Sequence, residues 1–184
     1  MEQANQDLFT HEFETELKTH IRDIIDFPKE GVVFKDITNL LRNGRVFNSA
    51  VDRIVDAFRE KSIDIVCAVE ARGFILGAAV AHGLGAGFIP IRKPGKLPWD
   101  IHQQSYDLEY GEDTLEIHID AINAGNHVLF VDDVLATGGT AKASLDLISH
   151  MNGNLVGAVF LIELLFLNGR EKLGSVPSYS LIRY

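Results

Sequence analysis

The sequence predicts an α/β fold with an open, mainly parallel sheet and helices on both of its faces. Short β-branched runs such as Ile63 to Val69 alternate along the chain with longer segments whose apolar residues recur every three or four positions. Most of the short runs are continuously apolar, which is typical of parallel strands buried on both faces. Ligand sites in such sheets lie beyond the carboxyl ends of the strands, so functional residues are expected to follow the strands.

The first expected elements are two amphipathic helices. Apolar residues from Leu8 to Ile25 recur at helical steps among charged residues and predict one helix, which Pro28 bounds. The stretch Val46 to Lys61 repeats this periodicity and predicts a second helix. The buried strand Ile63 to Val69 follows it, and a helix followed by such a strand favours a parallel sheet.

The next segments repeat the alternation. Residues Gly73 to His82 predict a helix that the following glycines end, and Phe88 to Arg92 predicts a strand. The segment of about residues 93–112 is rich in Pro, Gly and polar side chains. It is expected to form a long, flexible lid loop, in which His102 is solvated. Leu115 to Asp120 alternates apolar with polar residues and predicts an edge strand, with His118 on its solvated face.

The last elements complete one domain over residues 1–184. His127 to Val131 and Val156 to Leu161 predict two more buried strands, with a helix from Thr140 to Met151 between them and a short tail after them. With 46% hydrophobic and 23% charged residues, a chain of this length can bury a substantial single core.

The charge and the apolar pattern limit the possible partners. A formal net charge of -9 argues against a nucleic-acid partner. No apolar run predicts a membrane span or a secretory signal, so a cytoplasmic protein is expected. The lone cysteine, Cys67, lies in an apolar run and is expected to be buried. Against this acidic background, the cluster of Arg92, Lys93 and Lys96 indicates a site for a small polyanion.

The strongest motif is VLFVDDVLATGGT, from Val128 to Thr140. Its glycine-rich turn opens a helix, so its backbone N–H groups can converge on a phosphate; the turn is Ala136, Thr137, Gly138, Gly139 and Thr140. Asp132 and Asp133, just before the turn, can accept hydrogen bonds from sugar hydroxyls or contribute to a magnesium shell. A P-loop is excluded because no Lys follows the glycines. The motif therefore suits a phosphorylated sugar.

A second segment, Glu70 to Phe74, follows another buried strand and should reach the same sheet edge. The guanidinium of Arg72 within it is suited to a pyrophosphate. A third segment, GVVFKDI from Gly31 to Ile37, carries the main-chain groups of Val33 and Lys35 and the ring of Phe34. Burial of Val32, Val33 and Phe34 in the core is the alternative interpretation of this segment.

These motifs resemble the type I phosphoribosyltransferases, whose phosphoribosyl pyrophosphate motif is a strand, two acids and a TGGT-like turn. The segments RKPGKLP from Arg92 and YDLEYG from Tyr106 look like the lid of the adenine-specific members, and the resemblance runs from about Phe27 to Leu173. It implies transfer of phosphoribose from phosphoribosyl pyrophosphate to adenine, giving AMP and pyrophosphate with Mg²⁺, by an enzyme that is commonly a homodimer.

The resemblance also implies roles for individual residues. Pyrophosphate would be held by Arg72, Arg92, Lys93 and Lys96, with a non-proline cis peptide near Ala71-Arg72. Adenine would be bound by a small N-terminal hood, within residues of about 1–40, through Val33, Phe34 and Lys35; a backbone N–H and C=O pair complements its ring nitrogen and amine. Glu109 would be the general base in the lid, and Tyr110 would help to close it. Asp132 and Asp133 would contact Mg²⁺ directly or through water.

Two alternatives remain open from the sequence. Enzymes of this fold that act on hypoxanthine, guanine or orotate share the acid-pair turn and differ in the base pocket and lid. Some proteins of this fold regulate transcription, sensing phosphoribosyl pyrophosphate and binding nucleic acid without catalysis, although the acidic balance and the lid argue against this.

Overall fold

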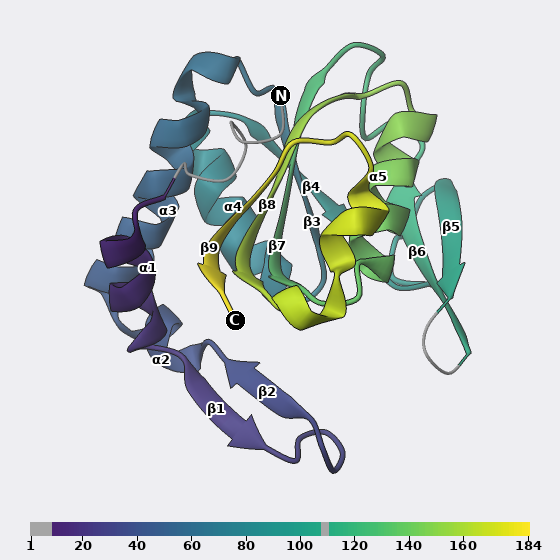
Figure 1. The fold of residues 1–184 in the computed structure, drawn as a ribbon. Coiled ribbons are helices and arrows are strands. Elements are labelled where there is room, and N and C mark those ends of the chain that lie inside the picture. Colours follow the sequence, from purple (N-terminus) through teal and green to yellow (C-terminus); the bar gives the residue numbers. More distant parts are fainter. Residues whose placement is uncertain (1–8, 108–110) are drawn as a thin grey trace.

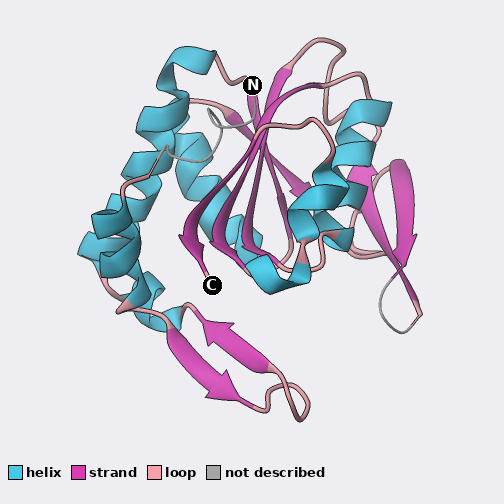
Figure 2. Ribbon diagram, viewed as in Figure 1, coloured by secondary structure: helices cyan, strands magenta, loops and turns pink. Residues whose placement is uncertain are grey.

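The computed structural model describes residues 9–107 and 111–184 and has a five-stranded sheet at its centre (Figures 1 and 2). The strands are β3 (Ile65–Val69), β4 (Gly87–Ile91), β7 (His127–Leu135), β8 (Asn154–Glu163) and β9 (Ser178–Arg183). Their order is β4-β3-β7-β8-β9, and every neighbouring pair is parallel. The predicted fold class is therefore confirmed, as are the buried strands and the helices between them.

Helices cover both faces of this sheet, as Figure 1 shows. One apolar core includes α3 (Gly44–Phe58) and α4 (Arg72–Leu84) and takes Leu129 and Val131 from β7. The other includes α5 (Gly139–His150) and takes Val128 and Phe130 from the same strand. Successive side chains of a strand point to opposite faces, so a strand between two cores must be apolar at every position. Cys67 of β3 is fully buried in the second core, as predicted.

The N-terminal segment differs from the single helix predicted for it. Helix α1 covers only His11–Lys18 and is followed by an antiparallel hairpin of β1 (Arg22–Ile25) and β2 (Val33–Asp36), then by α2 (Thr38–Arg42). The prediction failed because apolar residues spaced for a helix up to Leu17 happened to continue into a β-branched pair, Ile24 and Ile25, that fits a strand. This hairpin projects from the body near the carboxyl ends of the strands (Figure 1); it lies in the segment predicted to form the hood, and residues 22–36 are called the hood below.

The predicted lid loop is also partly wrong, because it contains a strand. Strand β5 (Ile101–Asp107) pairs with β6 (Glu112–His118) in an antiparallel two-stranded sheet, here called the lid hairpin. Backbone pairing needs no apolar alternation, so the polar residues of β5 concealed it from pattern analysis. Residues 108–110, which connect the two strands in sequence, lie outside the described residues.

Strand β6 was predicted as an edge strand with one solvated face; it lies in the two-stranded lid hairpin, and the solvated face was wrong. It meets the chain after β4 through one bridge, Arg92 with Glu116. Glu116 is 6% exposed and accepts a hydrogen bond from the N–H of Gly95 at 2.9 Å, so a polar residue on the expected wet face is buried with a partner. His118 is half-buried rather than solvated, and its Nε2 makes no hydrogen bond with the described residues.

The tail after β8 contains more structure than expected. Two short 3-10 helices, η2 (Leu165–Leu167) and η3 (Gly169–Leu173), lead into β9, which completes the sheet; a third, η1 (Arg59–Lys61), extends α3. The alternation of Ser and apolar residues in β9 is too short to be distinctive as a sequence pattern. Among residues 9–107 and 111–184, no helix is both long and apolar enough to cross a membrane.

Candidate functional site

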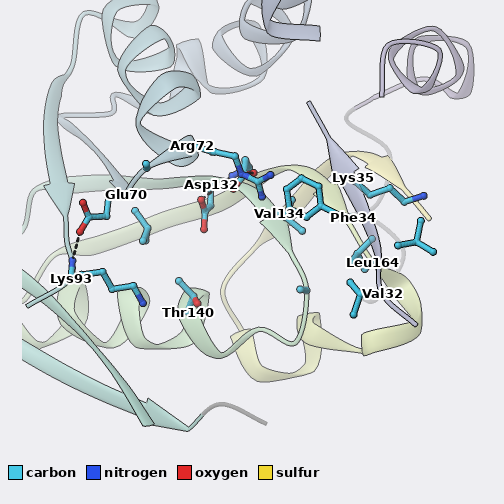
Figure 3. A pocket seen from close by; sticks show the side chains of 15 residues that line it. Val32, Phe34, Lys35, Glu70, Arg72, Lys93, Asp132, Val134, Thr140 and Leu164 are labelled. Atoms are coloured by element: carbon cyan, nitrogen blue, oxygen red, sulfur yellow. Dashed lines mark hydrogen bonds and ion pairs between the residues drawn. The ribbon is translucent and has the colours of Figure 1, made fainter. Parts of the chain in front are cut away.

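A cavity of about 410 Å³ opens at the carboxyl ends of β3 and β7 and beneath the hood (Figure 3). Its lining combines the three sequence motifs: Val32 to Lys35 from the hood, Val69 to Arg72 after β3, and Asp132, Asp133, Ala136 and Thr140 from the strand–turn–helix segment. Lys93, Val134 and Leu164 complete it. The parallel sheet thus brings together residues separated by about a hundred positions, at the edge where ligands are expected.

The acidic pair forms the floor of this cavity. Asp132 and Asp133 lie inside β7, which continues to Leu135, and each is only 7% exposed. Burial raises the pKa of both carboxyls, and repulsion from Asp133 raises the pKa of Asp132 further. The Asp132 Oδ1 accepts the N–H of Asp133 at 2.9 Å. A Cβ at Gly73, in the first turn of α4, would lie 2.5 Å from the same oxygen, so a larger residue there would displace the Asp132 carboxylate.

Arg72 connects the acids to the hood. Its Nε lies 2.6 Å from Asp133 Oδ2, and its guanidinium lies 4.8 Å from the centre of the Phe34 ring. The contact with Asp133 is an ion pair without hydrogen-bond geometry, since Oδ2 accepts no hydrogen bond from the described residues. The non-proline cis peptide joins Glu70 to Ala71, one bond before the predicted position.

The glycine-rich turn opens α5 as predicted. Gly138 has a φ of +79° and is the residue that precedes the first helical turn; its carbonyl accepts the N–H of Lys142 at 2.9 Å. The first N–H groups of a helix have no partner within it, so Gly139 and Thr140 present donors at the start of α5. Residues 134–141 surround a hollow of about 60 Å³ here. This arrangement can accept an anion.

The basic cluster is organised by Glu70, which sequence reasoning did not single out. Its carboxylate accepts hydrogen bonds from Arg92 NH2 at 2.9 Å and from the N–H of Lys93 at 2.6 Å, and Lys96 Nζ lies 3.8 Å away. Burial alone would raise the pKa of Glu70, but these bonds and the charges of Arg92 and Lys96 lower it. Of the cluster, only Lys93 lines the main cavity. The sequence feature that could have identified Glu70 is its position directly after strand β3.

The lid hairpin supplies two further residues that the sequence analysis missed. Lys93 Nζ pairs with Asp113 and donates to the Tyr106 hydroxyl at 3.3 Å. Burial lowers the pKa of Lys93, but these two partners outweigh it and raise it overall. Tyr106 lies in β5, within the predicted lid loop, and Asp113 lies in β6, between that loop and the strand predicted from Leu115, so no side-chain direction could be assigned to either.

The hood residues predicted for base recognition do line the cavity. Val33 is 42% exposed, and neither Val33 nor Phe34 belongs to either apolar core, so the core-packing interpretation is wrong for them. The Lys35 side chain turns away toward Asp23, at 2.8 Å, and lies 3.8 Å from the centre of the Tyr184 ring. Only its main chain is therefore placed to contact a base.

The remaining predicted lid residues are placed as follows. Glu109 and Tyr110 lie outside the described residues. His102 is half-buried in β5 rather than solvated; its ring packs edge-on against His150 of α5, with centroids 5.0 Å apart, and is not part of the cavity lining.

This combination of an open parallel sheet, an acid pair and a turn that can accept an anion is typical of the phosphoribosyltransferases. The family model described as the phosphoribosyl transferase domain matches residues 36–174. The adenine phosphoribosyltransferase of Acaryochloris marina is 54% identical over 169 residues, 92% of this chain and 99% of that one. That of Thermotoga maritima is 52% identical over 172 residues, 94% and 99% of the two chains.

Solved structures agree. The adenine phosphoribosyltransferase of Thermoanaerobacter pseudethanolicus is 48% identical with a TM-score of 0.90, covering 92% of this chain and 99% of that one. The enzyme of Saccharomyces cerevisiae, solved with an imino-altritol bisphosphate and adenine, is 40% identical with a TM-score of 0.88, covering 94% and 99%. The chain belongs to the adenine phosphoribosyltransferase family.

Proposed function

We propose that this chain transfers the phosphoribosyl group of phosphoribosyl pyrophosphate to adenine and releases AMP and pyrophosphate. The observation that carries the proposal is the single cavity in which Phe34, the buried acid pair and the start of α5 meet. An aromatic ring suits a base, carboxylates suit sugar hydroxyls, and a helix start suits a phosphate. The yeast relative, solved with adenine and a bisphosphate, supports the same pairing of ligands.

The 5'-phosphate is assigned to the turn at the start of α5. Backbone N–H groups of Ala136 to Thr140, together with the hydroxyls of Thr137 and Thr140, would surround it. The left-handed conformation of Gly138 supports this role, because it directs successive N–H groups toward one point.

The ribose hydroxyls are assigned to Asp132 and Asp133, together with Mg²⁺. Their burial beside the Arg72 guanidinium favours a further positive charge at the carboxylate oxygens. The described residues contain no group of three His, Cys, Asp or Glu side chains that could cage a metal. This fits Mg²⁺, which is often held by one or two carboxylates, water and substrate phosphates. When bound, it would neutralise charge on the departing pyrophosphate.

The pyrophosphate is assigned to Arg72 and to the basic cluster that Glu70 organises. Lys93 lines the cavity, whereas Arg92 and Lys96 lie behind it on the Glu70 carboxylate. Positive groups held in place before the reaction can stabilise the negative charge that develops on the leaving group.

Adenine is assigned to the hood, stacked on Phe34 and read by main-chain groups of Val33 and Lys35. The imidazole nitrogen of adenine would attack the anomeric carbon as the bond from that carbon to the pyrophosphate oxygen breaks. Glu109 would take the proton from the attacking nitrogen, and Tyr110 would help to exclude water. Both lie outside the described residues.

A homodimer in the cytoplasm completes the proposal. The α4 segment after Arg72 supports a subunit contact, because Ile75 on it is exposed. Helix α1 is less suited to a subunit contact, since Phe13 and Leu17 already bury its apolar face within the chain. A cytoplasmic location fits phosphoribosyl pyrophosphate, a polyanion that cannot cross a membrane unaided.

The test is a base-competition assay. The purified chain is mixed with phosphoribosyl pyrophosphate, Mg²⁺ and equal amounts of adenine, hypoxanthine, guanine and orotate, and the nucleotides formed are separated and measured. We expect AMP to be the dominant product and chelation of Mg²⁺ to stop its formation. Faster formation of another nucleotide, or none at all with Mg²⁺ present, would refute the assignment. Sedimentation at assay concentration tests the dimer separately.

A further inference from the structure

The phosphate turn is backed by a second glycine, Gly169, from the tail of the chain. A Cβ built on Gly169 would overlap the carbonyl oxygen of Ala136 and lie 2.9 Å from the nitrogen of Gly138. A Cβ on Gly138 would in return overlap the carbonyl oxygen of Gly169 and lie 3.0 Å from its carbon. The two backbones are therefore in direct contact, with no room for a methyl group on either side.

This contact lies on the protein side of the turn. The hollow at the start of α5 is lined by residues 134–141, and Gly169 is not among them. Gly169 therefore supports the backbone of Ala136 to Gly138 from behind without reaching the ligand space. Any displacement of Gly169 toward the turn would move the N–H groups that are aimed at the anion.

Gly169 is held in place by the residue after it. Arg170 Nε donates to Glu163 Oε1 at 2.8 Å, and its NH1 donates to the Ser178 carbonyl at 2.5 Å. Ser180 donates to the same carboxylate at 2.7 Å. Glu163 is 3% exposed; burial raises the pKa of its carboxyl, but the hydrogen bonds from Arg170 and Ser180 outweigh this and lower it. Arg170 thus ties the start of η3 to β8 and β9.

We infer that Gly169 and Arg170 are positioning residues for the 5'-phosphate turn. Gly169 sets where the backbone of the turn lies, and Arg170 fixes Gly169 to the rigid edge of the sheet. The inference rests on the proposed function only in taking a sugar phosphate as the ligand of the turn. It makes the segment Gly169–Leu173 part of the substrate site, although no side chain of that segment lines the main cavity.

The test separates this role from a general effect on folding. Gly83 provides the control, because a Cβ there would lie 2.6 Å from Val55 Cγ2, a tight contact between α4 and α3 outside the cavity. The variants Gly169→Ala, Arg170→Lys and Gly83→Ala are compared with the unmodified chain. The measurements are calorimetric binding of ribose 5-phosphate, the KM for adenine, and the melting temperature.

We expect Gly169→Ala to weaken ribose 5-phosphate binding by about tenfold or more, because a small shift of a positioned group has effects of this size. Arg170→Lys should weaken it by about threefold to tenfold, since the charge remains but the bidentate contact is lost. Both should leave the KM for adenine within about twofold, because no residue of η3 lines the main cavity beside the hood. Gly83→Ala should lower the melting temperature and leave both ligand measurements unchanged.

Binding of ribose 5-phosphate by Gly169→Ala or Arg170→Lys as tight as by the unmodified chain would overturn the inference. So would an equal loss in Gly83→Ala, which would indicate a loss of general stability. If Gly169→Ala does not fold, the ribose 5-phosphate binding of Arg170→Lys alone decides whether the inference holds. An unmodified chain that binds ribose 5-phosphate but forms no AMP would refute the proposed function, while the calorimetry would still decide the inference. An unmodified chain that does not bind ribose 5-phosphate would refute the inference directly.

Discussion

The Thr140 hydroxyl donates a hydrogen bond of 3.1 Å to the hydroxyl of Tyr106 and so joins the first turn of α5 to the lid hairpin. The Tyr106 hydroxyl donates in turn to Asp113 Oδ2 at 3.1 Å, and Asp113 pairs with Lys93. Two groups proposed to bind opposite ends of phosphoribosyl pyrophosphate, Thr140 and Lys93, therefore belong to one hydrogen-bonded network. The position of the lid hairpin is coupled to both.

Replacing Tyr106 with Phe removes this coupling and keeps the ring. We expect the KM for phosphoribosyl pyrophosphate to rise about fivefold, since one lost hydrogen bond is worth ~1 kcal/mol. The KM for adenine should change less, because Tyr106 does not line the cavity. Steady-state kinetics with each substrate varied in turn measures both. Tyr179→Phe, on β9, is the matched control, and equal effects of the two variants would contradict the prediction.

Phe34→Leu tests the hood. Loss of the aromatic face should raise the KM for adenine by about tenfold, as expected for removing one base–aromatic stack. The KM for phosphoribosyl pyrophosphate should rise less, although Arg72 loses its contact with the ring. Fluorescence titration with AMP provides a second measurement. An unchanged KM for adenine would remove Phe34 from the base site.

The sequence was sufficient to predict the main sheet and the grouping of the site. Strands with apolar residues at every position, such as Val128 to Val131, have few alternatives to burial between two layers of helices. Because parallel strands end at one edge, residues that follow β3 and β7 were bound to meet. Glycines mark the turn of the VLFVDDVLATGGT motif, so a phosphate-binding role could also be predicted from the local sequence.

The lid hairpin and the hood could not be predicted in the same way. Strand β5 has polar residues such as Gln103 and Gln104, and it is held by backbone pairing that leaves no periodic signal. The helical spacing of apolar residues continues to Ile24 and Ile25, although helix α1 ends at Lys18. The roles of Glu70 and Gly169 depend on contacts across 23 and more positions, which no local pattern records.

Glu109→Gln tests the chemical step at the tip of the lid. A neutral amide cannot take the proton from adenine, so turnover should fall by about a hundredfold, the size of general-base contributions. The KM for phosphoribosyl pyrophosphate should stay within about threefold, because the pyrophosphate is assigned to other residues. Rapid-quench measurement of the first turnover separates chemistry from product release. A turnover equal to that of the unmodified chain would exclude Glu109 as the base.

The buried acid pair makes the stability of the ligand-free protein depend on pH in an unusual direction. Burial, and for Asp132 the charge of Asp133, raise both pKa values above their ordinary value of 3.8. Between 3.8 and the raised pKa, the folded state binds more protons than the unfolded state. The contribution of the pair to the free energy of unfolding therefore falls as the pH rises through this window.

Asp132→Asn isolates this contribution, because the other buried carboxylates, such as Glu70 and Glu163, have lowered pKa values and remain in both proteins. Near pH 4 the variant should be about as stable as the unmodified chain, because Asp132 is then protonated in the folded protein. Near pH 8 it should be more stable by about 1–2 kcal/mol, since it no longer holds a second buried charge beside Asp133. Urea unfolding without ligands at both pH values measures the difference. A gain that is constant or shrinks with rising pH would mean that Asp132 does not titrate above its ordinary range. The same variant should bind ribose 5-phosphate more weakly. The buried acid pair would then lower the stability of the folded protein but be needed to bind the substrate.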